Sequence, residues 1–112
     1  MFDNFFSKQY IYKTKDGKAY FKFSYHKITE GKRTYYEIDI HSTPSYRNKD
    51  SGSHIAHWLP TERSTGKKIC FYAGKEPKTL ELAKKYSCDY AELTWIYIKT
   101  GITIDQQIAQ RN

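Results

Sequence analysis

Apolar and polar residues alternate along two early stretches of the chain, and this two-residue period predicts β-strands. Residues 9–14 form the first candidate strand, and the Asp16-Gly17 pair after it suits the positive φ angles of a tight hairpin turn. The strand that follows has an apolar face, formed by Ala19, Phe21, Phe23 and Tyr25. Its other, more polar face is formed by Tyr20, Lys22, Ser24 and His26. The pattern indicates a sheet with one dry face.

Two later segments repeat this alternation. In residues 34–41 the inward positions are Tyr36, Ile38 and Ile40, and the outward positions are Tyr35, Glu37, Asp39 and His41. In residues 67–73 the inward positions are Ile69, Phe71 and Ala73, and the outward positions are Lys68, Cys70 and Tyr72. With the first hairpin, these segments predict four antiparallel strands.

A long helix is predicted between Thr79 and Gly101. The Thr79 hydroxyl can accept an N–H of the first turn, Glu81 complements the positive helix end, and glycine suits the left-handed residue that ends many helices. The helix has a wide apolar stripe, made of Leu80, Leu82, Ala83, Tyr86, Tyr90, Ala91, Leu93, Tyr97 and Ile98. We expect this stripe to pack on the dry face of the sheet.

The element order ββββα predicts an α+β fold, a four-stranded antiparallel sheet with one long C-terminal helix packed on one face. No linker or repeat divides the chain, so we expect residues 1–112 to form a single domain with its core in residues 9–101. Residues 102–112 are either a short terminal helix, for which Thr103 and Gln106 would supply a capping box, or a tail.

Charge narrows the classes of partner. The chain has 112 residues and a formal net charge of +7, which favours nucleic acid or an acidic protein surface. Lys and Arg outnumber Asp and Glu over residues 8–33 and 47–75 but not over 76–99, so positive charge belongs mainly to the sheet and its loops. Without a membrane-spanning run or a signal-peptide pattern, we expect a cytoplasmic protein in which Cys70 and Cys88 are free thiols.

The connection over residues 44–66 is the most informative irregularity, because long loops are uncommon inside compact domains and are often functional. It mixes cations with flat rings as a nucleic-acid contact would, through Tyr46, Arg47, Lys49, His54, His57, Trp58 and Arg63. In the alternative interpretation, Ile55, Trp58 and Leu59 fold back to cap one end of the core and the charges are simply solvated.

The outer sheet face is a second candidate surface. A meander would place together Tyr10, Tyr12, Tyr20, Lys22, His26, Tyr35, Lys68 and Tyr72. Their rings could stack on unpaired bases while the lysines contact phosphates, although Glu37 and Asp39 would oppose this unless paired with Lys22 or Lys68. Because tyrosine has a high strand propensity, a half-exposed sheet without a ligand is the alternative.

Other chemistries find less support. His54 and His57, with His41 upstream, allow a structural zinc site or a histidine-dependent ribonuclease as alternatives, but no fourth ligand or flanking motif accompanies them. No nucleotide-binding glycine pattern or nucleophile elbow occurs. We therefore predict a non-catalytic protein without a cofactor or metal. Trp95 and Ile96 indicate an apolar strip on the helix for a partner or a second copy, with ordinary partial exposure as the alternative, and exposed strand edges allow a homodimer.

The stretch STPSYRNKDSGSHIAHWLP, followed by KKICFYAGKEPKTLELAKKYSCDYAELTWIYIKTG, resembles short uncharacterised bacterial proteins of the kind carried on mobile elements. The resemblance covers about residues 35–101 and implies no assigned activity. The order ββββα is also similar to the repeat of the PUR and Whirly single-stranded nucleic-acid binders, but none of their motifs is matched.

The leading hypothesis is that the loop over residues 46–63 and the outer sheet face bind single-stranded or structured nucleic acid. The alternative from another class is a mobile-element accessory or inhibitor protein, for example an anti-CRISPR, that binds a protein complex. DNA, RNA and protein remain alternative targets at this level.

Overall fold

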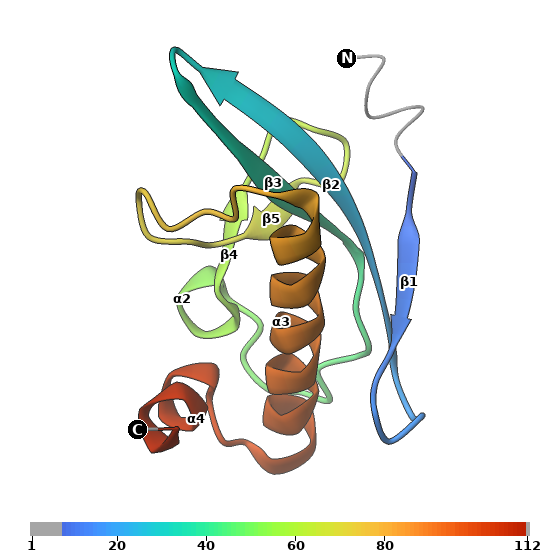
Figure 1. Cartoon of the computed structure of the whole chain (residues 1–112). Helices are drawn as coiled ribbons and strands as arrows, with labels where there is room; N and C mark the ends of the chain where they lie inside the picture. Colours follow the sequence, from blue (N-terminus) through green and yellow to red (C-terminus); the bar gives the residue numbers. More distant parts are fainter. Residues whose placement is uncertain (1–7, 112) are drawn as a thin grey trace.

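The computed structural model describes residues 8–111, in which a five-stranded antiparallel sheet packs against one long helix (Figure 1). The first three strands, β1 (Tyr10–Lys13), β2 (Tyr20–Glu30) and β3 (Arg33–Ser42), pair in sequence order. Between β1 and β2 the Thr14 amide donates to the Ala19 carbonyl at 2.9 Å, and Gly17 has a φ of 74°. The predicted turn at Asp16-Gly17 is therefore confirmed.

The remaining strands correct the predicted sheet. After the short helix α2 (Ser53–Ala56), the strands β4 (Trp58–Pro60) and β5 (Lys67–Ile69) form a further hairpin, and the order across the sheet is β1-β2-β3-β5-β4. The prediction of four strands was wrong because β4 lies inside the segment that we expected to be a loop. Its short length and its proline hide a strand from pattern analysis, although proline is tolerated on an edge strand such as this one.

The strand predicted over residues 67–73 ends early, at Ile69. The chain turns after it, because the Lys75 amide donates to the Tyr72 carbonyl at 2.9 Å and Gly74 has a φ of 80°. Phe71 still packs against the core, but it does so by contact with the Tyr86 ring of the long helix that follows. Its period-two position therefore reflects contact with the helix and not a continued strand.

The long helix α3 (Leu80–Thr100) has the predicted ends. The Leu82 amide donates to the Thr79 hydroxyl at 3.1 Å, and Gly101, at a φ of 83°, donates its amide to the Tyr97 carbonyl at 2.7 Å. In Figure 1, α3 lies over one face of the sheet, with β1 at its side. The predicted packing of a C-terminal helix on one sheet face is confirmed.

The buried face of α3 is narrower than the predicted stripe. Leu80 and Leu82 are each 37% exposed, whereas the small residues Ala83 and Ser87 are fully buried. The Ser87 hydroxyl lies 2.7 Å from that of Tyr25 on β2, so a polar residue occupies a position facing the sheet. Small side chains there let the helix approach the strands closely, a requirement that an apolarity pattern does not report.

The core lies between α3 and the sheet and includes Phe21, Phe23, Ile38, Ile40, Ile69, Ala91, Leu93 and Ile98. A last helix, α4 (Ile104–Gln110), buries Ile104 against this core. Thr103 and Gln106 form its capping box, so the short terminal helix is the correct alternative for this segment. No helix in residues 8–111 is long and apolar enough to cross a membrane.

Candidate nucleic-acid interface

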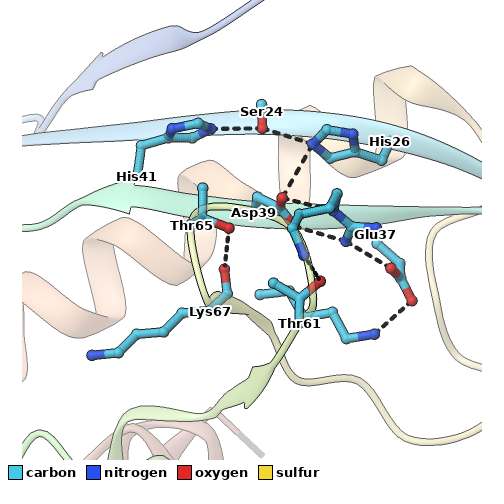
Figure 2. A network of polar contacts seen from close by, with 10 residues as sticks. Ser24, His26, Glu37, Asp39, His41, Thr61, Thr65 and Lys67 are labelled. Carbon is cyan, nitrogen blue, oxygen red and sulfur yellow. Dashed lines mark hydrogen bonds and ion pairs between the residues drawn. The ribbon is translucent and has the colours of Figure 1, made fainter. Parts of the chain in front are cut away.

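Arg63, a predicted nucleic-acid contact, is engaged in an ion-pair network with Glu37 and Asp39 of β3, both labelled in Figure 2. The loop between β4 and β5 folds over β3, and the Arg63 guanidinium donates to Asp39 at 2.7 and 2.8 Å and to Glu37 at 2.7 Å. Lys68 of β5 donates to the other Glu37 oxygen at 2.6 Å. We call these four side chains the Arg63 network. Both of its cations are already neutralised by carboxylates.

The carboxylates of the Arg63 network are held in their charged form. Asp39 is only 1% exposed, and burial by itself would raise the pKa of its carboxyl. Hydrogen bonds from His26 and Arg63 outweigh burial and hold this pKa well below its usual range. The Glu37 pKa is lowered in the same way, because bonds from Lys68 and Arg63 exceed the effect of burial. The network therefore remains ionised in neutral solution.

A polar chain extends from Asp39 along β2. His26 Nε2 lies 3.2 Å from Asp39 Oδ2, and Ser24 Oγ lies 2.8 Å from His26 Nε2 and 2.7 Å from His41 Nε2 (Figure 2). His41 is the extra residue of a bulge, because the register shifts by one position between Lys22 and Phe23 of β2. Burial lowers the His41 pKa, which favours the neutral form of its ring. Ser24 is 1% exposed, so this chain is a buried structural contact.

Arg47, by contrast, stands at a turn in the loop after β3. Arg47 and Asn48 have φ values of 53° and 68°, and the Lys49 amide donates to the Tyr46 carbonyl at 3.0 Å. Two consecutive left-handed residues are uncommon without glycine; asparagine tolerates this conformation, whereas it costs an arginine on the order of 1–2 kcal/mol. Strain at an exposed arginine is the kind of local cost that is retained where the side chain has a use.

The Arg47 side chain reaches the C-terminal end of α3. Its guanidinium lies 5.1 Å from the centroid of the Trp95 ring, and the Lys99 ammonium lies 5.5 Å from the same ring. The Trp95 indole donates to Asp16 of the β1–β2 turn at 2.7 Å, and Lys99 also contacts Asp16 at 3.1 Å. Trp95 is only 4% exposed and supports the cations from below. The expectation that Trp95 forms an exposed strip is therefore wrong.

Further cations flank this position. Lys49 lies beside Gly101, because a Cβ added at that glycine would be 3.7 Å from the Lys49 Cε atom. The exposed Lys15 and Lys18 adjoin Asp16 in the turn. We call the group of Arg47, Lys49, Lys99, Lys15, Lys18, Asp16 and Trp95 the Trp95 cluster. Its cations outnumber its single carboxylate, and within residues 8–111 only Lys99 among them has an ion-pair partner.

The outer face of β1 and β2 adds an exposed ring. Tyr20 is 56% exposed and pairs across the strands with Lys13, and Lys22 pairs with Ile11, which is 67% exposed. Partners in an antiparallel pair share a face, so these four side chains form one basic, partly apolar surface next to the Trp95 cluster. We call it the Tyr20 patch.

Two tyrosines predicted for the outer face point the other way. Tyr12 donates to Glu92 of α3, and the Tyr10 ring lies 5.3 Å from that of Tyr25 on the helix side of the sheet. Tyr72 is outside the strands altogether and is 86% exposed. The predicted continuous tyrosine surface is therefore wrong, and Tyr20 is the residue of that set that offers an open ring on a strand.

The other predicted contact residues are dispersed. Tyr35 is 8% exposed and lies under the Arg33 guanidinium, and the Tyr46 ring packs against Tyr97 of α3 at 6.2 Å. Trp58 packs against the core and donates its indole N–H to the Ser51 carbonyl at 2.9 Å, whereas Leu59, which the core-capping interpretation grouped with it, is 40% exposed. Lys67 covers the Trp58 ring at 4.5 Å.

The histidines do not converge on one site. His54 Nε2 lies 3.4 Å from Asp50, His57 Nε2 lies 2.9 Å from Asp105 of α4, and His41 contacts Ser24. Within the described residues, no group of three or more His, Cys, Asp or Glu side chains could hold a metal ion. This arrangement lends no support to the zinc or ribonuclease alternatives.

Sequence reasoning missed Trp95, Lys99 and Asp16 as parts of the basic surface. Asp16 and Trp95 are far apart in the chain and meet only through the tertiary fold, so no local spacing could have paired them. The available signal was the charge excess over residues 8–33, which includes the lysines beside Asp16.

No protein-family model matches the sequence, and no curated protein or solved structure is significantly similar to the chain. The geometry of the surface therefore has to carry the functional argument.

Proposed function

We propose that this protein binds nucleic acid without catalysis, and that the Trp95 cluster contacts the phosphate backbone. The observation that carries the proposal is that Arg47 lies over Trp95 and Lys49 lies beside Gly101 at one end of α3, next to the turn that carries Lys15 and Lys18. None of these four cations has an ion-pair partner in residues 8–111. Such cations retain their charge for an external anion, and each phosphate contact releases condensed counterions. The predicted contacts Arg63 and Lys68 contribute little, because carboxylates already neutralise them.

The Tyr20 patch favours a single-stranded or unpaired target. An open ring next to lysines can stack on a splayed base, and stacking of this kind is worth about 1–3 kcal/mol per base. The bases of a regular duplex are not available to such a ring. The proposal therefore assigns backbone contact to the Trp95 cluster and base stacking to Tyr20, with Lys13 and Lys22 beside it.

Fluorescence-polarisation binding across a salt series tests this proposal. Nuclease-treated protein should bind labelled single-stranded DNA or RNA, and its affinity should fall with salt. The variant Arg47→Ala/Lys49→Ala should lower the slope of log K against log salt by about 1.4, since each single-strand phosphate contact contributes about 0.7.

The control variant Lys84→Ala/Lys85→Ala removes the same charge from the second turn of α3, far from the end that carries the Trp95 cluster. It should keep most of the wild-type slope. Salt-independent binding, or equal losses in the two variants, would contradict backbone contact by the Trp95 cluster.

A groove between α3 and α4 favours a second candidate, an accessory or inhibitor protein that binds a protein complex. The groove has a volume of about 870 Å³, and its apolar residues Tyr86, Ile96 and Ile102 are each more than a third exposed. Stoichiometric capture of one protein after nuclease treatment, lost on Ile96→Asp, would favour this candidate over nucleic-acid binding.

A further inference from the structure

A hollow lies at the end of the β2–β3 hairpin, next to the segment that leads into α3. It has a volume of about 420 Å³, and its lining includes Lys32, Arg33, Thr34, Tyr35, Glu76 and Lys78. The segment is fixed against β3, because the Tyr36 amide donates to the carbonyl of the fully buried Pro77 at 2.8 Å. The backbone segments on the two sides of the hollow are therefore held together by the fold.

Arg33 is oriented within this hollow by two contacts. Its guanidinium lies 4.7 Å from the centroid of the Tyr35 ring, and its Nη2 atom lies 3.3 Å from Glu76 Oε1. The Tyr35 ring is itself fixed, since its hydroxyl donates to Glu30 at 2.9 Å. A guanidinium has five N–H donors, so one contact with Glu76 leaves most of its donors for another acceptor.

Lys32 and Lys78 give the hollow an excess of positive charge. Among the ion pairs of residues 8–111, Glu76 is the carboxylate engaged here, and it pairs with Arg33. Lys32 and Lys78 have no ion-pair partner in that part of the chain. A planar guanidinium fork flanked by two ammonium groups is a combination suited to the oxygens of a phosphate.

We infer that this hollow, the hairpin-end site, is a second anion site that takes a phosphate group. Lys78 adjoins Thr79, the N-cap of α3, whereas Lys99 lies in the last turn, so this site and the Trp95 cluster lie at opposite ends of the helix (Figure 1). A helix of 21 residues is about 30 Å long. If the proposed function holds, on which this consequence rests, a strand that reaches both sites binds more tightly than one that reaches a single site.

Titration of the whole protein with inorganic phosphate and with pyrophosphate, followed by amide NMR, tests the site without nucleic acid. The amides of Thr34, Tyr35 and Lys78 should shift saturably. The variant Lys32→Ala/Lys78→Ala should weaken this response at least about tenfold, as expected on removal of two charged contacts. Lys84→Ala/Lys85→Ala should leave it unchanged, and the spectra themselves report whether each variant is folded.

Two further arms identify the source of the phosphate. Tighter binding of a nucleoside monophosphate than of a dinucleotide would indicate a small phosphorylated ligand. Weaker binding of a long oligonucleotide to the Lys32→Ala/Lys78→Ala variant would indicate a nucleic-acid backbone. Shifts spread equally over all lysine-bearing segments, or unaffected by that double variant, would overturn the hairpin-end site. If only the proposed role of the Trp95 cluster is wrong, phosphate will still bind at the hairpin-end site, and Arg47→Ala/Lys49→Ala will leave the affinity for oligonucleotides unchanged.

Discussion

Arg63 and Arg47 both come from the loop region between β3 and β5, yet they occupy opposite electrostatic situations. Arg63 lies between Asp39 and Glu37 with its charge neutralised, whereas Arg47 stands over the face of Trp95 without a carboxylate partner in residues 8–111. The difference shows that a basic loop is not one functional unit. Which cation is available to a ligand is decided by the carboxylates that the fold brings to it from other strands.

Replacing Arg63 should produce the largest effect and would test this contrast directly. Arg63→Met leaves the buried Asp39 and the half-buried Glu37 without their main counter-charge, and we expect a loss of about 3–5 kcal/mol in the free energy of unfolding. Urea denaturation measures this loss. The matched substitution Arg47→Met should change it by less than about 1 kcal/mol. Similar costs at the two positions would remove the distinction between them.

The stability difference between wild type and Arg63→Met should shrink as the pH falls. The pKa values of Asp39 and Glu37 are lowered in the folded protein, so their stabilising effect is present above the unfolded carboxyl pKa of about 4 and is lost as the pH falls below it. In the variant, protonation instead removes the penalty of unpaired charge. Unfolding curves between neutral pH and about pH 3 measure the difference. A gap that stays constant would mean that charge is not its cause.

Arg47→Gly should separate binding from stability. Glycine adopts the left-handed conformation of this position without strain, a gain of about 1 kcal/mol that offsets the loss of the contact with Trp95. We therefore expect an unfolding free energy within about 0.5 kcal/mol of wild type, while the salt slope of binding falls by about 0.7. Unchanged binding by this folded variant would exclude Arg47 from the interface.

Local signals account for the parts of the fold that could be predicted. The Thr79 cap, the glycine at 101 and the Thr103–Gln106 capping box each act within a few residues, so the sequence contains the whole cause. The alternation along β2 and β3 placed their core residues correctly for the same reason. The missed strand β4 has too few residues for a period, and its pairing with β5 depends on a turn that carries no strong signal.

The candidate surface was harder to predict, because its residues depend on distant parts of the chain. Ser24, Asp39 and Tyr35 lie on the outer face as expected from the alternation, but all three are buried there by other side chains. The alternation predicts the face of the sheet on which a side chain lies, but it does not predict which other side chains cover it. Arg47 and Lys49 were predicted as contacts from the sequence, and the structure leaves Arg47 exposed and Lys49 partly buried. Their grouping with Asp16 and Trp95 is a property of the tertiary fold.

The strand order also divides the sheet into two parts, the β1–β2–β3 meander and the β4–β5 hairpin, and each part pairs strands that are neighbours in sequence. They join where β3 meets β5, and the partner residues in register there are Asp39 and Lys68. Backbone pairing at this junction is far shorter than along β2 and β3, and the Arg63 network adds side-chain contacts that link the β4–β5 hairpin to β3. The sheet should therefore open first at this junction, and the amides of Lys67–Ile69 should exchange with solvent by a local opening well before the β2–β3 hairpin unfolds.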